Sequence, residues 1–312
     1  MTDTTVLDDY IAQYSRWGTW GEDDQLGAIN LVGPEQVRAA AALVRDGKVI
    51  SLTLPYDQQG PQPGAIRSNP QLVTTATGTD VLAGTQGDFP GDFGYSDDMI
   101  IMGLQCGTQW DALSHIFHKG KMWNGYSAGD HTSNGAVRNG IQHWSDKLVM
   151  RGVLIDVAAH HGDASLEDGY PITVEDLEAT LAAQGSTIAP GDALLVRTGQ
   201  LGARRHDWGT YAGGDAPGLS VHTAPWLYDQ QQIAAVVTDT WGMEVRPNEI
   251  DAFQPLHQVI LVHMGLAVGE IFDLDALAAD CAADRRYEFM LAATPLNITG
   301  AVGSPVGAVA IK

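Results

Sequence analysis

Cysteine is scarce in this sequence, and its two copies, Cys106 and Cys281, lie far apart. A disulfide framework needs several cysteines, and zinc or thiol–disulfide sites of the CxxC type need pairs at short spacing. The sequence therefore excludes a disulfide-stapled fold and a CxxC site. Because a reducing compartment is the default for such a chain, we expect a cytoplasmic protein.

Long apolar runs and positive charge are also in short supply. No run reaches the roughly 18 apolar residues that a membrane-spanning helix needs, and the start of the chain, MTDTTVLDDYIAQYSRWGTW, has no basic or apolar leader segment. Lysine and arginine number 17 against 38 aspartates and glutamates, a formal net charge of −21. Because such a field repels nucleic acid and anionic lipid, we expect small molecules and divalent cations as ligands instead.

The sequence does contain enough apolar side chains for a large core, since 44% of its 312 residues are hydrophobic. Short β-branched runs are interrupted by a few helices, and no internal repeat or low-complexity linker divides them. We therefore predict an α/β protein with a mixed, barrel-like β-sheet core in a single domain over residues 1–312. Residues 1–47 are predicted to form an N-terminal helical extension of that domain.

Strands are predicted where β-branched and apolar residues form short runs. These runs are KVISLTL, MIIMGLQCGTQWD, RGVLIDVA, DALLVRTG, IAAVVTDT, QVILVHMG, EFMLAATPL and GAVAIK. A helix is predicted over PEQVRAAAALVRDGK, with Pro34 in its first turn and Gly47 beyond its end, and another over TVEDLEATLAAQG. Residues 58–94 are rich in Gly, Pro, Gln, Asn and Thr and predict long loops that lie over a surface or cover a site.

The stretch LQCGTQWDALSH, residues 104–115, carries the clearest sign of chemistry. On a strand, alternate side chains share a face, so Gln105, Gln109 and Asp111 are expected to point the same way. His115 lies four residues beyond Asp111, where a turn could bring its imidazole back toward the carboxylate. The alternative is structural: the glutamines pair with neighbouring backbone and Asp111 caps a turn.

The segment GTQWDALSH resembles the metal-binding motif of the bacterial cyclase and kynurenine formamidase family of metal-dependent hydrolases, His-x-Gly-Thr-His-x-Asp-x-Pro-x-His. The matching residues are Gly107, Thr108, Asp111 and His115. The departures are Gln105 and Gln109, which replace histidines, and Leu113, which replaces proline. The resemblance continues through RGVLIDVA, GDALLVRTG, VVTDTWGMEV and HQVILVHMGLAVGE. It implies the swivelling β/β/α cyclase-like fold and a homodimer or homotetramer.

In this family a downstream histidine and a glutamate about a dozen residues later complete the metal site. The resemblance gives these roles to His257 and Glu270, beside Asp111 and His115; Gln258 fits the family spacing better but is a weaker ligand. Because a glutamine amide binds metal less well than imidazole, the two replaced histidines imply one divalent ion per chain, manganese or zinc, rather than two. The two replacing residues, Gln105 and Gln109, are then expected to act either as distant ligands or as hydrogen-bond donors that bind substrate.

The resemblance implies hydrolysis of a small cyclic amide, a lactone or an N-formyl amide, with the ion activating water and polarising the carbonyl. The catalytic base is either Glu270 or one of His160 and His161, in AAHHGD, although a solvated loop tip is the alternative for this histidine pair. Trp110 and Trp241 are candidates to line an aromatic substrate cavity, the alternative being a place in the core.

Two other functions remain open at this point. The same fold could work without metal, with Asp111 and Glu270 as an acid–base pair that cyclises or isomerises a small molecule. It could also be a non-catalytic small-molecule binding protein. Metal analysis of the purified protein separates the metal-dependent hydrolase from both.

Overall fold

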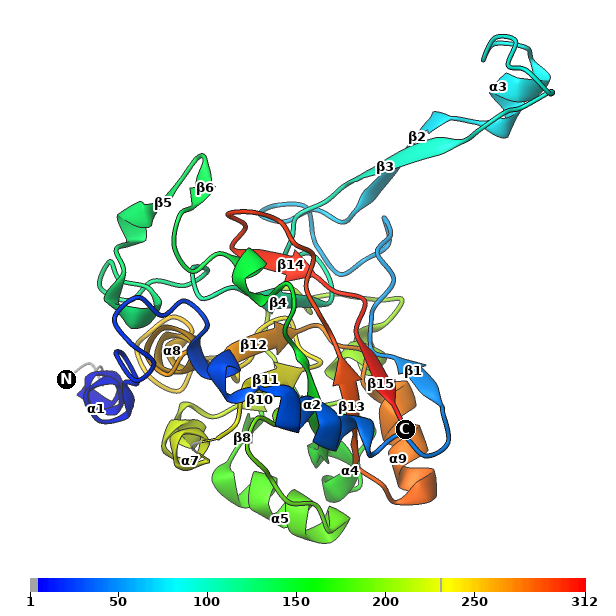
Figure 1. Ribbon diagram of the computed structural model, residues 1–312. Coiled ribbons are helices and arrows are strands. Elements are labelled where there is room, and N and C mark those ends of the chain that lie inside the picture. Colours follow the sequence, from blue (N-terminus) through cyan, green and yellow to red (C-terminus); the bar gives the residue numbers. More distant parts are fainter. Residues whose placement is uncertain (1–4, 231) are drawn as a thin grey trace.

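The computed structural model describes residues 5–230 and 232–312, and a mixed sheet of nine strands forms its centre (Figure 1). These strands are β1 Val49–Ser51, β4 Gln109–Asp111, β7 Val149–Asp156, β9 Ala193–Arg197, β11 Ala235–Thr238, β12 Ala267–Glu270, β13 Glu288–Ala292, β14 Gly303–Pro305 and β15 Val309–Ile311. They follow the order β1-β15-β13-β7-β9-β11-β12-β4-β14. The middle strands β7, β9, β11 and β12 are parallel, and the remaining neighbours are antiparallel. The predicted α/β class with a mixed, curled sheet is confirmed.

Three two-stranded sheets lie outside the main one. Their strands are β2 Gln71–Ala76 with β3 Asp97–Ile101, β5 His131–Thr132 with β6 Gly135–Ala136, and β8 Pro171–Ile172 with β10 Gly218–Leu219. The β2–β3 hairpin projects from the rest of the molecule and carries α3 at its far end (Figure 1).

Short helices surround the sheet. The α-helices are α1 Thr5–Tyr14, α2 Pro34–Ala41, α3 Gly78–Leu82, α4 Val157–His161, α5 Val174–Gln184, α6 Gln200–Arg204, α7 Ala224–Asp229, α8 Pro255–His257 and α9 Asp275–Asp284. The 3-10 helices are η1 Gly27–Leu31, η2 Trp123–Gly125, η3 Ala128–Asp130, η4 Ile141–Trp144 and η5 Val221–Thr223, and η6 Gln258–His263 is a π-helix. Within the described ranges, no helix is long and apolar enough to cross a membrane.

Helix α5 begins and ends where its sequence signals predict. Thr173 Oγ1 accepts a hydrogen bond from the Asp176 backbone N–H, and the Asp176 carboxylate accepts one from the Thr173 N–H, which satisfies two helix-end donors. Gly185 closes the helix at φ +71°, a conformation that glycine adopts without strain. Helix α2 also starts at Pro34, but it ends at Ala41, well before the predicted stop at Gly47.

The N-terminal segment lies against the body of the protein. Helix α1 contacts the π-helix η6 and α7, and α2 contacts β7 and β13. The predicted extension over residues 1–47 therefore contains these two helices and η1, while residues 1–4 lie outside the described part of the chain.

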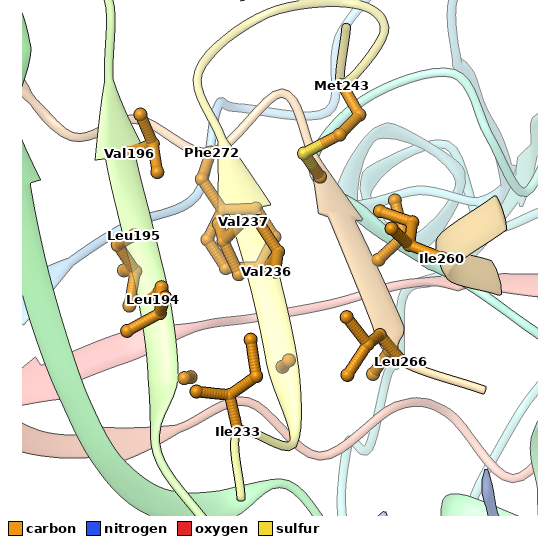
Figure 2. Close-up of a cluster of buried hydrophobic side chains, with 14 of the residues drawn as sticks. Leu194, Leu195, Val196, Ile233, Val236, Val237, Met243, Ile260, Leu266 and Phe272 are labelled. Carbon is orange, nitrogen blue, oxygen red and sulfur yellow. The ribbon is translucent and has the colours of Figure 1, made fainter. Parts of the chain in front are cut away.

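The core is centred on the parallel strands, whose sequences are apolar on both faces. Figure 2 shows the side chains of β9 and β11, among them Leu195 and Val237, together with Ile260 from η6 and Leu266 beside β12. Gly269 on β12 permits the closest packing there, because a Cβ atom would lie 2.9 Å from Trp110, Phe272 and Val237. Close packing here holds β12 against β4, the two strands that carry the candidate site.

Three expectations from the sequence are wrong in part. QVILVHMG forms the π-helix η6 rather than a strand, because a fully buried apolar run has no periodicity that separates the two structures. In MIIMGLQCGTQWD, residues 99–101 are the end of β3 and residues 109–111 form β4, and the turns between them interrupt the predicted alternation. Residues 58–94 are not all loop, since they contain β2 and α3.

Candidate metal centre

Strands β4 and β12 place two carboxylates and an amide side by side. The strands are antiparallel, with Gln109 opposite Glu270 and Asp111 opposite Val268. Because Gln109 and Asp111 are two residues apart on one strand, their side chains share a face. Gln109 Nε2 donates to Glu270 Oε2 at 3.0 Å and lies 3.4 Å from Asp111 Oδ1. The amide therefore sits between the two acids.

His257 completes this group from helix α8. Its Nε2 lies 3.0 Å from Glu270 Oε1 and 3.9 Å from Asp111 Oδ2. Asp111, His257 and Glu270 each offer a ligand atom, and these atoms lie within 4.8 Å of one another, so we call the three residues the triad. Their exposed fractions are 1%, 1% and 3%. The structure thus brings together three of the four predicted metal ligands in an interior site.

The backbone is strained beside Glu270 on β12 and at the start of helix α8, which carries His257. Ile271, directly after Glu270, has φ +57°, and Gln254, which precedes α8, has φ +47°. A β-branched residue rarely adopts this left-handed conformation. Ile271 is held there by its N–H, which donates to Thr240 O, and by its carbonyl, which accepts from Thr108 Oγ1 at 2.6 Å. Thr108 thereby fixes the start of β4 to the end of β12, a structural role for the Gly-Thr of the motif.

Glu244 is a site residue that sequence reasoning missed. It is buried, its carboxylate accepts a hydrogen bond from His257 Nδ1, and it also accepts one from the His257 backbone N–H at 3.2 Å. Holding Nδ1 in this way turns Nε2 toward Asp111 and Glu270. The sequence VVTDTWGMEV contains Glu244, but no spacing rule connects it with a histidine 13 residues away across a loop.

Burial and the neighbouring charges shift the pKa of Glu270, His257 and Glu244. Burial, and then the facing Asp111 carboxylate, raise the pKa of Glu270 to about 7. Burial alone would lower the pKa of His257, but Glu244 and Glu270 raise it well above its ordinary value. Burial likewise opposes ionisation of Glu244, yet the hydrogen bonds and charge of His257 lower its pKa. The site therefore holds carboxylates away from water, an arrangement that attracts a cation.

His115 lies at the edge of the triad rather than within it. Its Nε2 is 3.8 Å from Asp111 Oδ1, and burial of its ring lowers its pKa despite the Asp111 carboxylate. The Gln105 side chain precedes β4, and its Nε2 is buried without a hydrogen-bond partner in the described part of the chain. Neither residue bonds to Glu270 or His257, so the structure places both beside the site and not in its hydrogen-bond network.

The predicted histidine pair lies elsewhere. His160 and His161 are exposed residues of helix α4, and His161 Nε2 bonds to Asp176 at 2.9 Å and to Tyr170 Oη at 3.2 Å. In the described residues, neither histidine forms a hydrogen bond or ion pair with the triad. Their surroundings match the solvated alternative considered from the sequence.

The two candidate tryptophans occupy opposite environments. Trp110 is fully buried in the core, where its indole N–H donates to Ala293 O at 2.7 Å and its ring meets Phe272 edge-on. A side chain enclosed in this way on the other face of β4 has no surface for a substrate. Trp241 is half-buried, packs near Ile271, and its indole N–H donates to Gln62 Oε1.

Arg67 is a second residue that sequence reasoning missed. Its guanidinium lies 5.0 Å from the centre of the Trp241 ring and donates to Gln105 O, and its charge acts on the pKa values of both His115 and Glu270. Among the described residues it forms no ion pair. Arg67 thus adds a positive charge, with no ion-pair partner among the described residues, beside the acidic site.

The donor set fits a divalent cation. Two buried carboxylates face each other, and over the described chain no lysine or arginine forms an ion pair with either. Carboxylate oxygens and an imidazole nitrogen suit manganese and zinc, and the carboxylate behind the imidazole is the usual partner of a metal-bound histidine. Gln109 Oε1 is buried and unpartnered, so an amide oxygen is available as well.

Comparison with known proteins finds one matching family and several similar solved structures. The family described as "Putative cyclase" matches residues 50–245. A crystal structure of "a novel cyclase" is 39% identical, has a TM-score of 0.89, and covers 96% of this chain and 100% of its own. Isatin hydrolase A from Labrenzia aggregata is 20% identical with a TM-score of 0.62, covering 88% of this chain and 97% of its own.

A predicted metal-dependent hydrolase from Bacillus stearothermophilus is 20% identical with a TM-score of 0.52, and covers 84% of this chain and 97% of its own. At this identity the two hydrolases show a shared fold. Among curated proteins, no relative of this sequence is detected.

Proposed function

This chain belongs to the cyclase family, and from that premise we propose that it is a metal-dependent hydrolase of a small cyclic amide, a lactone or an N-formyl amide. The observation that carries the proposal is the triad, which gathers Asp111, His257 and Glu270 in the interior. An isatin hydrolase and a predicted metal-dependent hydrolase of the same fold support the reaction class. A kynurenine formamidase-like activity on aryl formamides belongs to this proposal, as does a cytoplasmic location.

The triad would hold the ion, with Asp111 and Glu270 supplying carboxylate oxygens and His257 supplying Nε2. His115 is proposed as a fourth ligand, because its Nε2 is 3.8 Å from Asp111 Oδ1. A divalent cation bound there supplies a Lewis acid that polarises a substrate carbonyl and acidifies water. Manganese and zinc both suit this mixture of oxygen and nitrogen donors.

The protein's own residues then orient and move protons. Glu244 accepts a hydrogen bond from His257 Nδ1, which directs Nε2 at the site, where a bound cation would replace the Nε2 proton. Glu270 is proposed both to help hold the ion and to act as the base that takes a proton from water, because its two carboxylate oxygens face different partners, Gln109 Nε2 and His257 Nε2. Gln109 Nε2, now 3.0 Å from Glu270, can turn to hold a substrate oxygen.

The experiment uses purified protein stripped with chelator and reloaded with manganese or zinc. Isatin, N-formylaniline and an aryl lactone are offered as substrates, with Asp111→Ala as the matched control. We expect the reloaded protein to hydrolyse at least one of them, and the stripped protein and Asp111→Ala to hydrolyse none. Equal hydrolysis by Asp111→Ala, or none by the reloaded protein, contradicts the proposal.

A metal-free acid–base reaction is the second candidate. It is favoured by one observation, that burial and the facing Asp111 carboxylate together raise the pKa of Glu270 to about 7, so that the two acids can share one proton. Such a pair could cyclise or isomerise a small molecule. Turnover that persists in chelator-treated protein supports this candidate and contradicts the hydrolase.

A further inference from the structure

Two arginines share the ring of Trp241 beside the triad. The Arg67 guanidinium lies 5.0 Å from the centre of this ring, and the Arg246 guanidinium lies 6.0 Å from it. Both arginines are half-buried, and within the described residues neither forms an ion pair. Because like charges repel, two guanidiniums on one ring with no carboxylate beside them form a surface that favours an anion.

Most of the hydrogen-bond donors of these two side chains are free to bind a ligand. Arg67 Nη1 donates to Gln105 O at 3.1 Å, and across the described ranges the Arg246 side chain donates to no other residue. A guanidinium that lies over a ring still presents N–H groups at its edge, in a fork that matches the two oxygens of a carboxylate. The two arginines can therefore bind a carboxylate while they remain stacked on Trp241.

Trp241 is held close to Glu270. It follows Thr240, whose carbonyl accepts a hydrogen bond from the N–H of Ile271, the residue directly after Glu270. Trp241 also packs against the buried cluster that contains Ile271. The charge of Arg67, stacked on this ring, lowers the pKa of Glu270. A ligand bound by the arginines would therefore lie next to the triad.

Arg67 is also held close to the motif strand. Its bond to Gln105 O and a bond of 2.9 Å from Gln62 Nε2 to Cys106 O tie the loop that carries it to the segment leading into β4. Gln62 Oε1 in turn accepts a hydrogen bond from Trp241 Nε1 at 3.2 Å. These contacts fix the cationic side chain and the aromatic ring in one place.

Phe253 supplies exposed apolar surface beside the arginines. Its ring centre lies 5.4 Å from the Arg246 guanidinium, and its side chain is 66% exposed. A single exposed aromatic residue is ordinary by itself. An aromatic ring next to two guanidiniums, however, can bind both the apolar and the charged part of an aryl carboxylate.

The charge of the whole chain gives this local positive charge its importance. With a net charge of −21, the protein repels anionic ligands, and the Asp111 and Glu270 carboxylates repel them within the site as well. An anionic substrate therefore needs a cationic group that holds its charge away from the two acids. Arg67 and Arg246 are placed to do this.

We infer that Arg67 and Arg246 form an anion subsite that selects substrates whose aryl group carries a carboxylate in addition to the hydrolysed amide or lactone. The carboxylate accepts hydrogen bonds from both guanidiniums, while the aryl ring packs on Phe253 and Trp241. This substrate class rests on the proposed function, whereas the binding of a carboxylate does not. The competing explanation is that the arginines only offset the negative charge of the triad.

Calorimetry on the chelator-treated, full-length chain tests the subsite without hydrolysis. The probes are benzoate and benzamide, which have the same shape and differ in charge. We expect benzoate to bind about tenfold more tightly, because charge-assisted hydrogen bonds replace neutral ones, and we expect salt to reduce the difference. Arg67→Gln and Arg246→Gln should each remove most of the preference for benzoate, and Arg67→Lys should keep part of it.

Arg138→Gln is the matched control. Arg138 lies 5.0 Å from the centre of the Tyr126 ring and, in the part of the chain that the structure describes, also has no ion-pair partner. This variant should bind benzoate as wild type does. Thermal unfolding of each variant checks that the fold is retained.

Three binding results overturn the subsite. Equal affinity of wild type for benzoate and benzamide would mean that the arginines only offset the charge of the triad. A preference for benzoate that survives in the double variant Arg67→Gln/Arg246→Gln would place the anion elsewhere. Binding of phenyl phosphate without binding of benzoate would exclude a carboxylate as the ligand.

Hydrolysis by protein reloaded with manganese or zinc tests the substrate class. The substrates are meta-formamidobenzoate and meta-formamidobenzamide, which again differ in charge. We expect kcat/KM to be about tenfold higher for the carboxylate, and this ratio to fall toward one in Arg67→Gln. Equal values in wild type overturn the substrate class. Hydrolysis of neither compound, with benzoate still preferred in calorimetry, contradicts the proposed function and supports the subsite.

Discussion

Gln109 and Glu270 face each other across strands β4 and β12, and Gln109 Nε2 donates a 3.0 Å hydrogen bond to Glu270 Oε2. The same nitrogen lies 3.4 Å from Asp111 Oδ1, while Gln109 Oε1 is buried without a partner. The amide therefore joins the two acids. If the Gln109 amide group flipped, Oε1 rather than Nε2 would face the two carboxylates, and it could then bind a cation held between them.

Gln109→Ala is expected to destabilise the cation-free protein more than the loaded one. Without a cation, the amide is the neutral donor that both Asp111 and Glu270 contact, and losing a buried hydrogen bond to a charged group costs about 1–3 kcal/mol. Urea unfolding of stripped and loaded protein measures the difference. Gln105→Ala is the control, because its Nε2 has no partner to lose in the described chain. Equal losses in both forms would contradict this role.

Asp111→Ala is expected to remove metal and activity together. Asp111 is one of the two carboxylates of the triad, so its loss leaves His257 and Glu270 as the remaining ligands. Elemental analysis should find about one divalent ion per wild-type chain and almost none in the variant. Two tightly held ions per wild-type chain would contradict the single site.

Glu244→Gln is expected to weaken metal binding by about 10–100-fold without unfolding the protein. The amide oxygen can still accept a hydrogen bond from His257 Nδ1, but it no longer supplies the charge that orients and polarises the ring. Competition with a chelator measures the affinity, and Glu244→Asp should recover part of it. An unchanged metal affinity in Glu244→Gln would contradict this role and leave Glu244 with a structural role alone.

His263 is expected to make the protein less stable in acid. Burial, then the charges of His118 and Lys119, lower its pKa to about 4 from 6.5, and its Nε2 lies 3.0 Å from His118 Nδ1. Between these two pH values the unfolded chain binds the proton and the folded chain does not, so stability falls as the pH falls from 6.5 toward 4. The loss approaches about 1.4 kcal/mol per pH unit.

His263→Gln should flatten this part of the stability curve, measured by urea unfolding at several pH values. His160→Gln, at an exposed site on α4, is the control and should leave the slope unchanged. A slope that His263→Gln does not alter would assign the acid sensitivity to other groups.

Trp110→Ala and Trp241→Ala are expected to separate stability from substrate binding. Trp110 is fully buried, so its truncation should cost about 3–5 kcal/mol. Trp241 is half-buried under Arg67, so its loss should raise KM and change stability by only about 1 kcal/mol. Thermal unfolding and steady-state kinetics distinguish the two. A raised KM in Trp110→Ala with unchanged stability would contradict its place in the core.

The sequence by itself determined the features that local patterns encode. The apolar, β-branched runs located β7, β9 and β11, and the pair Thr173 and Asp176 located the start of α5, because strand burial and helix capping act over a few residues. The motif strand also placed Asp111 at the site, since its pattern includes the backbone contacts of Thr108 as well as the ligands.

Only the tertiary structure decided what depends on contacts between distant segments. A continuous apolar run such as QVILVHMG is equally buried as strand or helix, and the packing around it made it helical. Glu244 meets His257 because α8 follows a strained turn at Gln254, which no local pattern shows. The triad is likewise a product of β4 lying beside β12, strands separated by more than 150 residues, and that pairing comes from the whole sheet.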